Sequence, residues 1–245
     1  MRDPVSVCMA SYNGFSYIKI QIESILKELS VDGDELIIVD DCSTDDTVKV
    51  IKAFTSNVIK LYCNEINFGY VKTFERAIYK AQNRYICLSD QDDIWISGRL
   101  NKMFEAAKKN NVSLIASNFE INNQSKKNVS FYNLKNENSS KYLGNIRRIF
   151  LGKSAYYGCT MMIDRNLLKF ILPFPGYIEA HDLYIAMTAN LLKSVYHISD
   201  NTLIYNIHQN NSSLRKRSLQ KKIKARYYFF KTILHFLKKR KNNNF

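Results

Sequence analysis

The chain has 245 residues, of which 46% are hydrophobic and 24% are charged. This composition suits one large domain or two small ones with a buried core, and it excludes a disordered chain. Only 8 Gly and 3 Pro exclude collagen-like and Gly/Pro-rich low-complexity chains. No apolar run approaches the ~20 residues of a membrane span, and residues 1–13 lack the pattern of a secretory signal.

The positive charge is concentrated at one end of the chain. The net charge is +14, but residues 214–245 alone carry 12 Lys and Arg and no Asp or Glu. The other 213 residues hold 24 Lys and Arg against 22 acids, a net charge of +2. A near-neutral body with a basic tail indicates a tail that meets anions, and not a uniform nucleic-acid-binding surface.

The five cysteines indicate neither a disulfide framework nor a zinc site. Their number is odd, and no two of them are spaced as C-x-x-C. We interpret them as small buried residues of a protein in a reducing compartment, which favours the cytoplasm.

Strand-like and helix-like segments alternate along the first half of the chain. Apolar runs predict strands at 5–9, 36–39, 58–62, 85–88 and 112–116. Apolar residues at helical spacing predict helices at 16–29, after Thr44, at 71–81 and at 100–107. Such alternation is typical of a mostly parallel sheet with right-handed crossovers and helices on both faces.

The alternation weakens in the second half of the chain. The stretch 121–141 is rich in Asn, Ser and Lys and predicts an exposed connection with at most one short strand. Helices are then predicted at 142–151 and 182–193, and strands at 158–163, 195–198 and 202–207. We interpret this half as the part that receives a second substrate.

Polar residues follow three of the predicted strands, in the segments 11–13, 40–41 and 90–93. Ligands bind outside the carboxyl ends of parallel strands, so we expect the three segments to converge on one site. The carboxylates in 40–41 and 90–93 repel each other unless a cation neutralises them, and oxygen ligands suit Mg²⁺ or Mn²⁺. The alternative for a single D-x-D is a solvated turn with helix-capping acids.

Several motifs together resemble those of family 2 glycosyltransferases of the GT-A fold. The first half carries VSVCMASYNG at 5–14, ELIIVDDCSTDD at 35–46, NFG at 67–69 and YICLSDQDDIWISGRL at 85–100. The second half carries GCTMMI at 158–163, AHDLYIA at 180–186 and YNIHQNNSS at 205–213, which resemble segments of bacterial rhamnosyltransferase-like members. The resemblance covers residues 1–213, and the basic tail lies outside it.

The resemblance implies an α/β GT-A fold with a Rossmann-like, mostly parallel central sheet, to which a basic helical tail is added. It divides the chain into a nucleotide-sugar-binding half (1–120), an acceptor-binding and catalytic half (121–213) and a basic amphipathic tail (214–245). The implied reaction is inverting transfer from a dTDP- or UDP-sugar, with dTDP-rhamnose among the candidates. The implied acceptor is a saccharide or lipid-linked saccharide in cell-surface polysaccharide synthesis.

The resemblance also implies a set of nucleotide-binding residues. Tyr12 and Asp41 match residues that hold the nucleotide base. Ala10 stands in the same motif, where many members have Thr, and Asn13 follows Tyr12 in it. Asp90 begins the D-x-D motif and is expected beside the ribose or the metal.

Three further residues are implied to carry the chemistry. Asp92 matches the aspartate that ligates the divalent cation, Mg²⁺ or Mn²⁺, and we expect Asp90 and His208 beside that ion. Asp182 matches the catalytic base, which takes the proton of the acceptor hydroxyl. From spacing alone, Asp182 could instead cap a helix beginning near Leu183, with Glu179 as the substitute base.

The tail is predicted to form an amphipathic helix. Ile223, Tyr227, Phe230, Leu234 and Leu237 recur at helical spacing among Lys and Arg. We interpret it as an interfacial helix on an anionic bilayer, which places the protein peripherally on the inner face of the cell membrane. The alternative is a helix packed on the domain with a solvated basic face. No nucleic acid is expected, because no RNA-binding module is visible.

Two other functions fit parts of the sequence. A non-catalytic basic adaptor would bind membrane or nucleic acid through the tail, but it has no use for carboxylates at strand ends. A sugar nucleotidyltransferase would need a glycine-rich phosphate loop after the first strand, and SYNG at 11–14 is not one.

Overall fold

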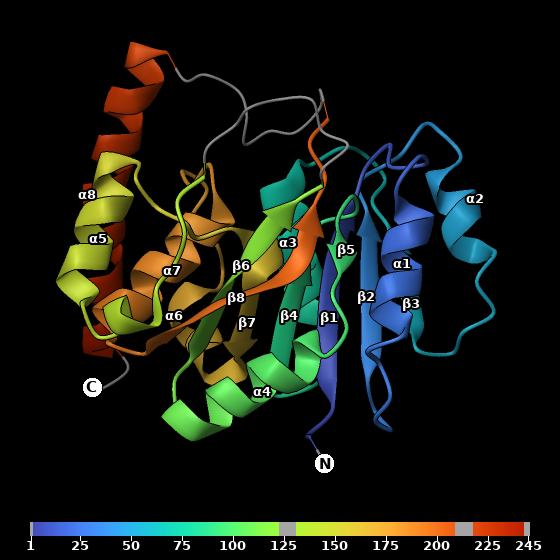
Figure 1. The fold of residues 1–245 in the computed structure, drawn as a ribbon. Helices are drawn as coiled ribbons and strands as arrows, with labels where there is room; N and C mark the ends of the chain where they lie inside the picture. Colours follow the sequence, from blue (N-terminus) through green and yellow to red (C-terminus); the bar gives the residue numbers. More distant parts are fainter. Residues whose placement is uncertain (1, 123–130, 209–217, 243–245) are drawn as a thin grey trace.

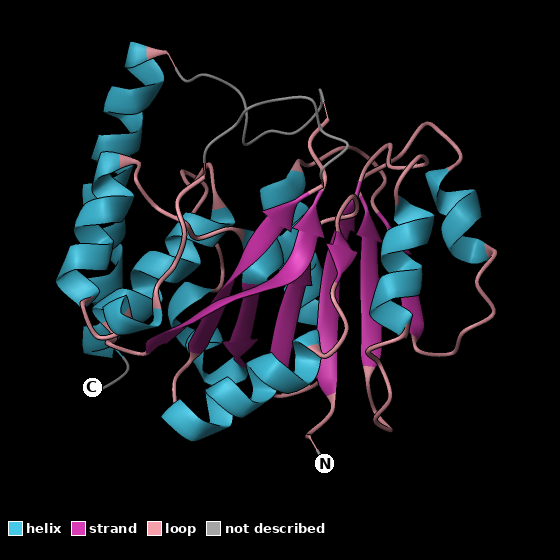
Figure 2. Ribbon diagram, in the orientation of Figure 1, coloured by secondary structure: helices cyan, strands magenta, loops and turns pink. Residues whose placement is uncertain are grey.

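The computed structural model describes residues 2–122, 131–208 and 218–242. In these residues an eight-stranded sheet has the strand order β3-β2-β1-β4-β7-β6-β8-β5 (Figure 2). The strands are β1 (Val5–Ser11), β2 (Glu35–Asp40), β3 (Ile59–Cys63), β4 (Tyr85–Ser89), β5 (Ile94–Trp95), β6 (Leu114–Ile121), β7 (Met161–Asp164) and β8 (Val195–Tyr205).

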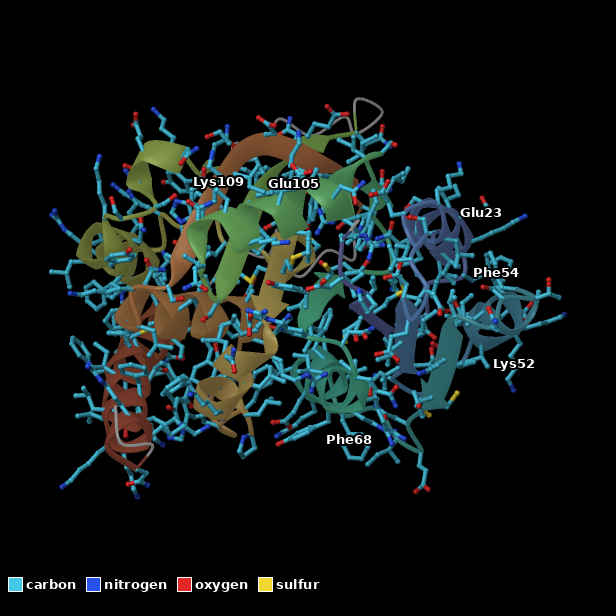
Figure 3. The ribbon with its side chains drawn as sticks, turned by 90° about the horizontal axis from the view of Figure 1, so that it is seen from below. Glu23, Lys52, Phe54, Phe68, Glu105 and Lys109 are labelled. Carbon is cyan, nitrogen blue, oxygen red and sulfur yellow. The ribbon has the colours of Figure 1, made fainter. Side chains whose placement is uncertain are left out.

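Helices cover both faces of this sheet. They are α1 (Ile18–Leu26), α2 (Thr47–Lys52), α3 (Tyr70–Lys80), α4 (Arg99–Asn110), α5 (Tyr142–Leu151), α6 (Leu168–Ile171), α7 (His181–Leu191) and α8 (Leu219–Asn242). In the view from below, Glu23 of α1 and Glu105 of α4 lie on one side of the sheet, and Phe68, just before α3, lies on the other (Figure 3).

The sheet is mostly parallel, as predicted. β1 pairs in parallel with β2 and β4, β2 with β3, and β6 with β8. β7 runs antiparallel between β4 and β6, and β5 is antiparallel to β8. Successive residues of the central strands face opposite layers: Ile37 packs in the core beneath α3 and α7, and Ile38 in the core beneath α1.

Three details differ from the sequence prediction. The two strands predicted at 195–198 and 202–207 are one strand, β8, whose exposed residues 199–201 resemble a turn in the sequence. Its pairing with β6 is irregular near Asn118, so the strand bends there without ending. The predicted strand at 158–163 begins with a 3₁₀ turn at 158–160, and β5 is too short to show periodicity. In the predicted connection, residues 131–141 hold one 3₁₀ turn, and 123–130 lie outside the described residues.

Helix α8 packs against the end of the molecule beside α5 and α7 (Figure 1). Phe236 is 3% exposed and contacts Phe170, and Phe229 contacts Phe150 of α5. The opposite face carries the predicted apolar stripe, whose five side chains are 51% to 67% exposed: Ile223, Tyr227, Phe230, Leu234 and Leu237. In the described part of the chain, no helix is long and apolar enough to span a bilayer.

Candidate active site

A cleft of about 1110 Å³ opens at the carboxyl ends of β1, β2 and β4. Its walls include residues 10–12 after β1, Asp41 after β2 and residues 90–92 after β4, so the three polar segments do converge. The opposite wall comes from the second half of the chain, through the end of α5, residues 156–159 and the start of α7 at 180–183. The cleft therefore joins the two halves that the sequence assigned to donor and acceptor.

The acidic segment after β4 is held in a largely buried position. Asp93 is 1% exposed; its Oδ1 accepts a 3.4 Å hydrogen bond from the Asn206 amide, and its Oδ2 has no partner among the described residues. Burial and the neighbouring Asp92 raise the pKa of Asp90 to about 7 and raise the pKa of Asp93 well above its usual range. The buried guanidinium of Arg99 interacts electrostatically with Asp93, but the pKa values of Asp90 and Asp93 stay raised, so this one cation does not offset their burial and mutual repulsion.

A divalent cation fits this group of oxygens. Asp90 and Asp92 both line the cleft, and Asp90, Asp93 and Cys159 each offer a ligand atom within 4.8 Å of one another. Burial raises the pKa of the Cys159 thiol, which therefore stays a neutral, soft ligand that Mg²⁺ and Mn²⁺ do not favour. The carboxylate oxygens match the preference of both ions, and Asp93 Oδ2 is a buried oxygen of this kind at the same place.

His208 lies next to this acidic segment. Its Nε2 is 2.6 Å from Asp92 Oδ2, and its ring stacks on Tyr17 with centroids 4.7 Å apart. Asn206 Nδ2 also donates to the Asp92 carbonyl at 2.6 Å. The residues that follow β8 thus hold Asp92 in position. His208 lies where it can orient a carboxylate oxygen that binds a metal, or bind the ion itself.

The nucleotide-side residues occupy different positions around the cleft. Ala10, the 44%-exposed Tyr12 and the buried Asp41 line it. Asn13 is not among the lining residues; its Oδ1 accepts a 2.8 Å hydrogen bond from the Thr44 amide and so ties the loop after β1 to the loop after β2. The structure therefore brings four of the five predicted nucleotide-binding residues into the cleft.

Asp41 also organises the loop before α3. Its Oδ1 accepts hydrogen bonds from Asn64 Nδ2 at 2.7 Å and from the Phe68 amide at 2.9 Å, and its Oδ2 accepts one from the Gly69 amide at 2.8 Å. Gly69 has φ +82°, a backbone conformation that favours glycine. The NFG motif at 67–69 is thus the partner of the carboxylate after β2.

Gln91 is a site residue to which the sequence analysis gave no role. Its Oε1 accepts from the Tyr12 amide at 2.9 Å, and its Nε2 donates to the Tyr12 carbonyl at 3.0 Å. A Cβ added to Gly14 would lie 2.1 Å from Gln91 Oε1, so only glycine leaves room for this contact. The sequence does show a glutamine between acids at the end of a predicted strand. It does not show that Gln91 contacts Tyr12, which is 79 residues away in the chain.

Asp182 stands on the acceptor side of the cleft. It lies in the first turn of α7, whose N-cap is Ala180, and its Oδ1 accepts a 2.7 Å hydrogen bond from the Leu183 amide. The carboxylate therefore lines the cleft as well as contacting its own helix start. The substitute base Glu179 does not line the cleft, and its Oε1 lies 3.5 Å from Lys224 Nζ of α8.

His181 sets the position of this helix start. It is 5% exposed and stacks on Phe74 with centroids 4.3 Å apart, and burial lowers its pKa to about 3, so the ring is neutral. A Cβ added to Gly158 would lie 2.8 Å from His181 Nε2 and 3.8 Å from Asp182 Cβ. Glycine at 158 thus permits the close approach that holds Asp182 in place.

We expect Gly158→Ala to lower kcat by about 10- to 100-fold, because the added methyl group displaces the start of α7 and with it the Asp182 carboxylate. Nucleotide binding on the other wall should remain, as measured by thermal shift. Gly176→Ala is the matched control, since no atom lies within 4 Å of a Cβ there. An unchanged kcat in Gly158→Ala would show that Asp182 does not depend on this contact.

The fold and the site define the class of protein. A mostly parallel sheet carries a group of carboxylates on one wall of a cleft at its carboxyl edge and a single helix-start carboxylate on the other, as expected of a nucleotide-dependent group-transfer enzyme. The chain belongs to glycosyl transferase family 2, which matches residues 6–172. It is therefore a glycosyltransferase that uses a nucleotide sugar and inverts the anomeric configuration, not a basic adaptor.

Curated relatives agree with this assignment. The chain is 33% identical over 183 residues to the UDP-Glc:α-D-GlcNAc-diphosphoundecaprenol β-1,3-glucosyltransferase WfgD of Escherichia coli, covering 74% of this chain and 67% of that protein. It is 28% identical over 219 residues to the dTDP-rhamnosyl transferase RfbG of Shigella flexneri, covering 83% and 72%. The resemblance to family 2 and to rhamnosyltransferase-like members is thus confirmed.

Solved structures confirm the GT-A fold. S. aureus TarS 1–349 in complex with UDP-GlcNAc superposes with a TM-score of 0.72 at 19% identity, covering 97% of this chain and 72% of that one. The mannosyltransferase PcManGT from Pyrobaculum calidifontis, in complex with GDP-Man and Mn²⁺, gives 0.64 at 14% identity, covering 98% and 73%. At these sequence identities the structural similarity supports the fold alone.

Proposed function

We propose that this enzyme transfers a sugar from a UDP- or dTDP-sugar to a lipid-linked saccharide in cell-surface polysaccharide synthesis, with Mg²⁺ or Mn²⁺ as cofactor. The observation that carries the proposal is the pairing, in one cleft, of the half-buried carboxylates Asp90 and Asp92 on the donor wall with Asp182 on the acceptor wall. The names of WfgD and RfbG support a nucleotide-sugar donor, and that of WfgD supports a lipid-diphosphate acceptor. Rhamnosyl transfer is the donor specificity that RfbG suggests.

The proposed reaction is a direct displacement. Asp182 takes the proton of the acceptor hydroxyl. At the same time the hydroxyl oxygen forms a bond to the anomeric carbon, from the face opposite the diphosphate. The bond from that carbon to the diphosphate oxygen breaks, and the nucleoside diphosphate leaves with the bonding electrons. Asp90 and Asp92 would hold the cation, His208 and Asn206 orient Asp92, and Gln91 fixes the Tyr12 backbone beside the nucleotide. A bound divalent cation neutralises charge that develops on the leaving diphosphate.

Nucleoside diphosphate and Mn²⁺ should raise the melting temperature of the protein together, and each much less alone, because both bind the native cleft. A thermal-shift panel of UDP, dTDP and GDP with Mn²⁺ or with EDTA measures this. Asp92→Asn should abolish the joint shift, whereas Asp32→Asn, an exposed acid outside the cleft, should keep it. Equal nucleotide affinity in EDTA and in Mn²⁺ would contradict the proposed metal dependence.

The proposal also places the enzyme on the inner face of the cell membrane, through α8. The 24-residue helix carries nine Lys and Arg and no acid, and the five side chains of its apolar stripe are each more than half exposed. Cations flanking an apolar stripe match the headgroups and acyl chains of an anionic bilayer. The helix packs on the domain mainly through other residues, Phe229, Thr232 and Phe236, and of the stripe Phe230 also contacts Phe150 of α5. Residues 214–217 of the predicted tail lie outside the described part of the chain.

A further inference from the structure

The positive charge in the cleft comes from one helix. Its lining includes four carboxylates, Asp41, Asp90, Asp92 and Asp182. Among the described residues that line it, the only Lys or Arg side chains are Lys222 and Arg226, both from the first turns of α8. Figure 1 shows this end of α8 on the same side of the molecule as the carboxyl edge of the sheet.

These two cations are not neutralised by the protein. Within residues 2–122, 131–208 and 218–242, no carboxylate forms an ion pair with either of them. Their neighbour Lys224 is the one that pairs with Glu179. Arg226 instead donates to the Lys222 carbonyl at 3.3 Å, and its guanidinium lies 5.5 Å from the centroid of the Phe150 ring. The guanidinium therefore stands at the α5–α8 contact with most of its donors open to a ligand.

An apolar pocket of about 130 Å³ adjoins the cleft at this point. It lies between α5, α7 and α8, and its walls include Phe150, Ile178 and Phe229. One acid, Glu179, also lines it, and its carboxylate pairs with Lys224 at 3.5 Å. The cleft and the pocket share Ile149, Gly152, Ala180, Leu183 and Arg226, so Arg226 stands where the polar space meets the apolar one. Apolar cavities of roughly 150 Å³ hold a molecule the size of benzene, which indicates room for a short hydrocarbon segment.

A ligand that suits this junction has a multiply charged anion next to a hydrocarbon chain. We propose that Lys222 and Arg226 bind the diphosphate that links the acceptor saccharide to its lipid, with the first part of the lipid in the pocket between α5, α7 and α8. The guanidinium offers paired donors to phosphate oxygens, and the ammonium adds a second charge. This inference rests on the proposed function, because it assumes a lipid-linked acceptor.

The position of the two cations assigns them to the acceptor and not to the donor. Arg226 lines both the cleft and the apolar pocket, and the other residues that the two share belong to the wall that carries Asp182: Ile149, Gly152, Ala180 and Leu183. The donor diphosphate is expected on the other wall, which carries Asp90 and Asp92, the residues that we propose hold the divalent cation.

The test uses farnesyl diphosphate as the probe, titrated calorimetrically into the full chain in EDTA so that no metal complex contributes. We expect wild type to bind it more tightly than farnesol or inorganic diphosphate. The double variant Lys222→Ala/Arg226→Ala should bind it about 10- to 100-fold more weakly, as expected for lost charge-assisted hydrogen bonds. The matched control Lys221→Ala/Lys238→Ala removes the same charge from α8 outside the cleft and should bind like wild type.

The nucleotide–Mn²⁺ thermal shift, measured on the same proteins, separates the two proposals. A retained shift in the double variant, together with weaker farnesyl diphosphate binding, supports an acceptor site distinct from the donor site. Unchanged farnesyl diphosphate affinity, or loss of the nucleotide shift instead, overturns the inference. If wild type binds farnesyl diphosphate but no nucleoside diphosphate, the proposed function fails while the anion–lipid site stands.

Discussion

Asp182→Asn should lower the rate of sugar transfer by about 10²- to 10⁴-fold and leave donor binding nearly unchanged. The amide keeps the size of the carboxylate and can still accept the Leu183 amide hydrogen bond through its oxygen, so α7 should begin at the same residue. It cannot take the proton of the acceptor hydroxyl. The base acts in the transition state on the acceptor, so its loss appears in kcat and not in nucleotide affinity.

Initial rates with saturating donor and the nucleotide–Mn²⁺ thermal shift measure the two quantities. Glu179→Gln tests the substitute base, because Glu179 lies three residues away, outside the cleft, at the wall of the adjoining pocket and near Lys224. The matched control is Asp32→Asn, an exposed acid outside both the cleft and the pocket, which should transfer sugar at the wild-type rate. Wild-type turnover in Asp182→Asn would make Asp182 a helix-start residue only, and a large loss in Glu179→Gln would move the base to that position.

The sequence predicted the sheet and most of its helices because the pattern that defines them is local. The helix predicted at 142–151 coincides with α5, and the runs before the polar segments at 40–41 and 90–93 are β2 and β4. Fully buried parallel strands produce continuous apolar runs that periodicity identifies without knowledge of their partners. β5 has only two residues, and β8 carries polar residues where it bends, so neither shows such a pattern.

The site was predictable in its acidic residues and not in the contacts that hold them. Carboxylates after strands indicate a site from position alone, and Asp90, Asp92 and Asp182 do meet in the cleft. The clamp of Gln91 on Tyr12 and the close approach of Gly158 to His181 join segments that are remote in sequence. A glutamine or a glycine has many roles in a chain, and only the folded geometry selects one.

The sequence also did not show which face of helix α8 packs on the domain. The apolar stripe from Ile223 to Leu237 could be recognised in the sequence from its helical spacing, and in the structure its side chains are exposed. The packing face, with Phe229, Thr232 and Phe236, was not singled out, because the helix is apolar on two sides. Which side meets the domain depends on the surface that α5, α6 and α7 offer, and that surface exists only after the chain has folded.

Replacing the exposed stripe of α8 should remove most of the affinity for anionic vesicles without unfolding the domain. In the variant Ile223→Ser/Leu234→Ser/Leu237→Ser, each replaced side chain is more than half exposed in the protein, so its loss costs little folding free energy. On a bilayer, each large apolar side chain contributes roughly 1.5–3 kcal/mol when fully buried. Even if the three side chains insert only partly, we expect their replacement to lower the vesicle affinity by at least about 100-fold.

The charges of α8 should act separately from its stripe. Cations near an anionic surface contribute on the order of 1 kcal/mol each and are screened by salt, whereas apolar insertion is not. Wild type should therefore bind vesicles less tightly at high salt but still measurably, and the stripe variant should bind at low salt only. Deleting the helix is a poorer test, because it uncovers the core residues that Phe236 covers.

Vesicle co-sedimentation at low and high salt, with the melting temperature measured in parallel, tests this expectation. Leu143→Ser is the matched control, because Leu143 of α5 is 82% exposed and lies off α8. It should sediment like wild type, since one exposed apolar residue does not make an insertion face. Sedimentation of the stripe variant equal to that of wild type at high salt would show that the apolar face does not enter the bilayer. A fall in melting temperature that matches the loss of sedimentation would instead assign the stripe to the stability of the domain.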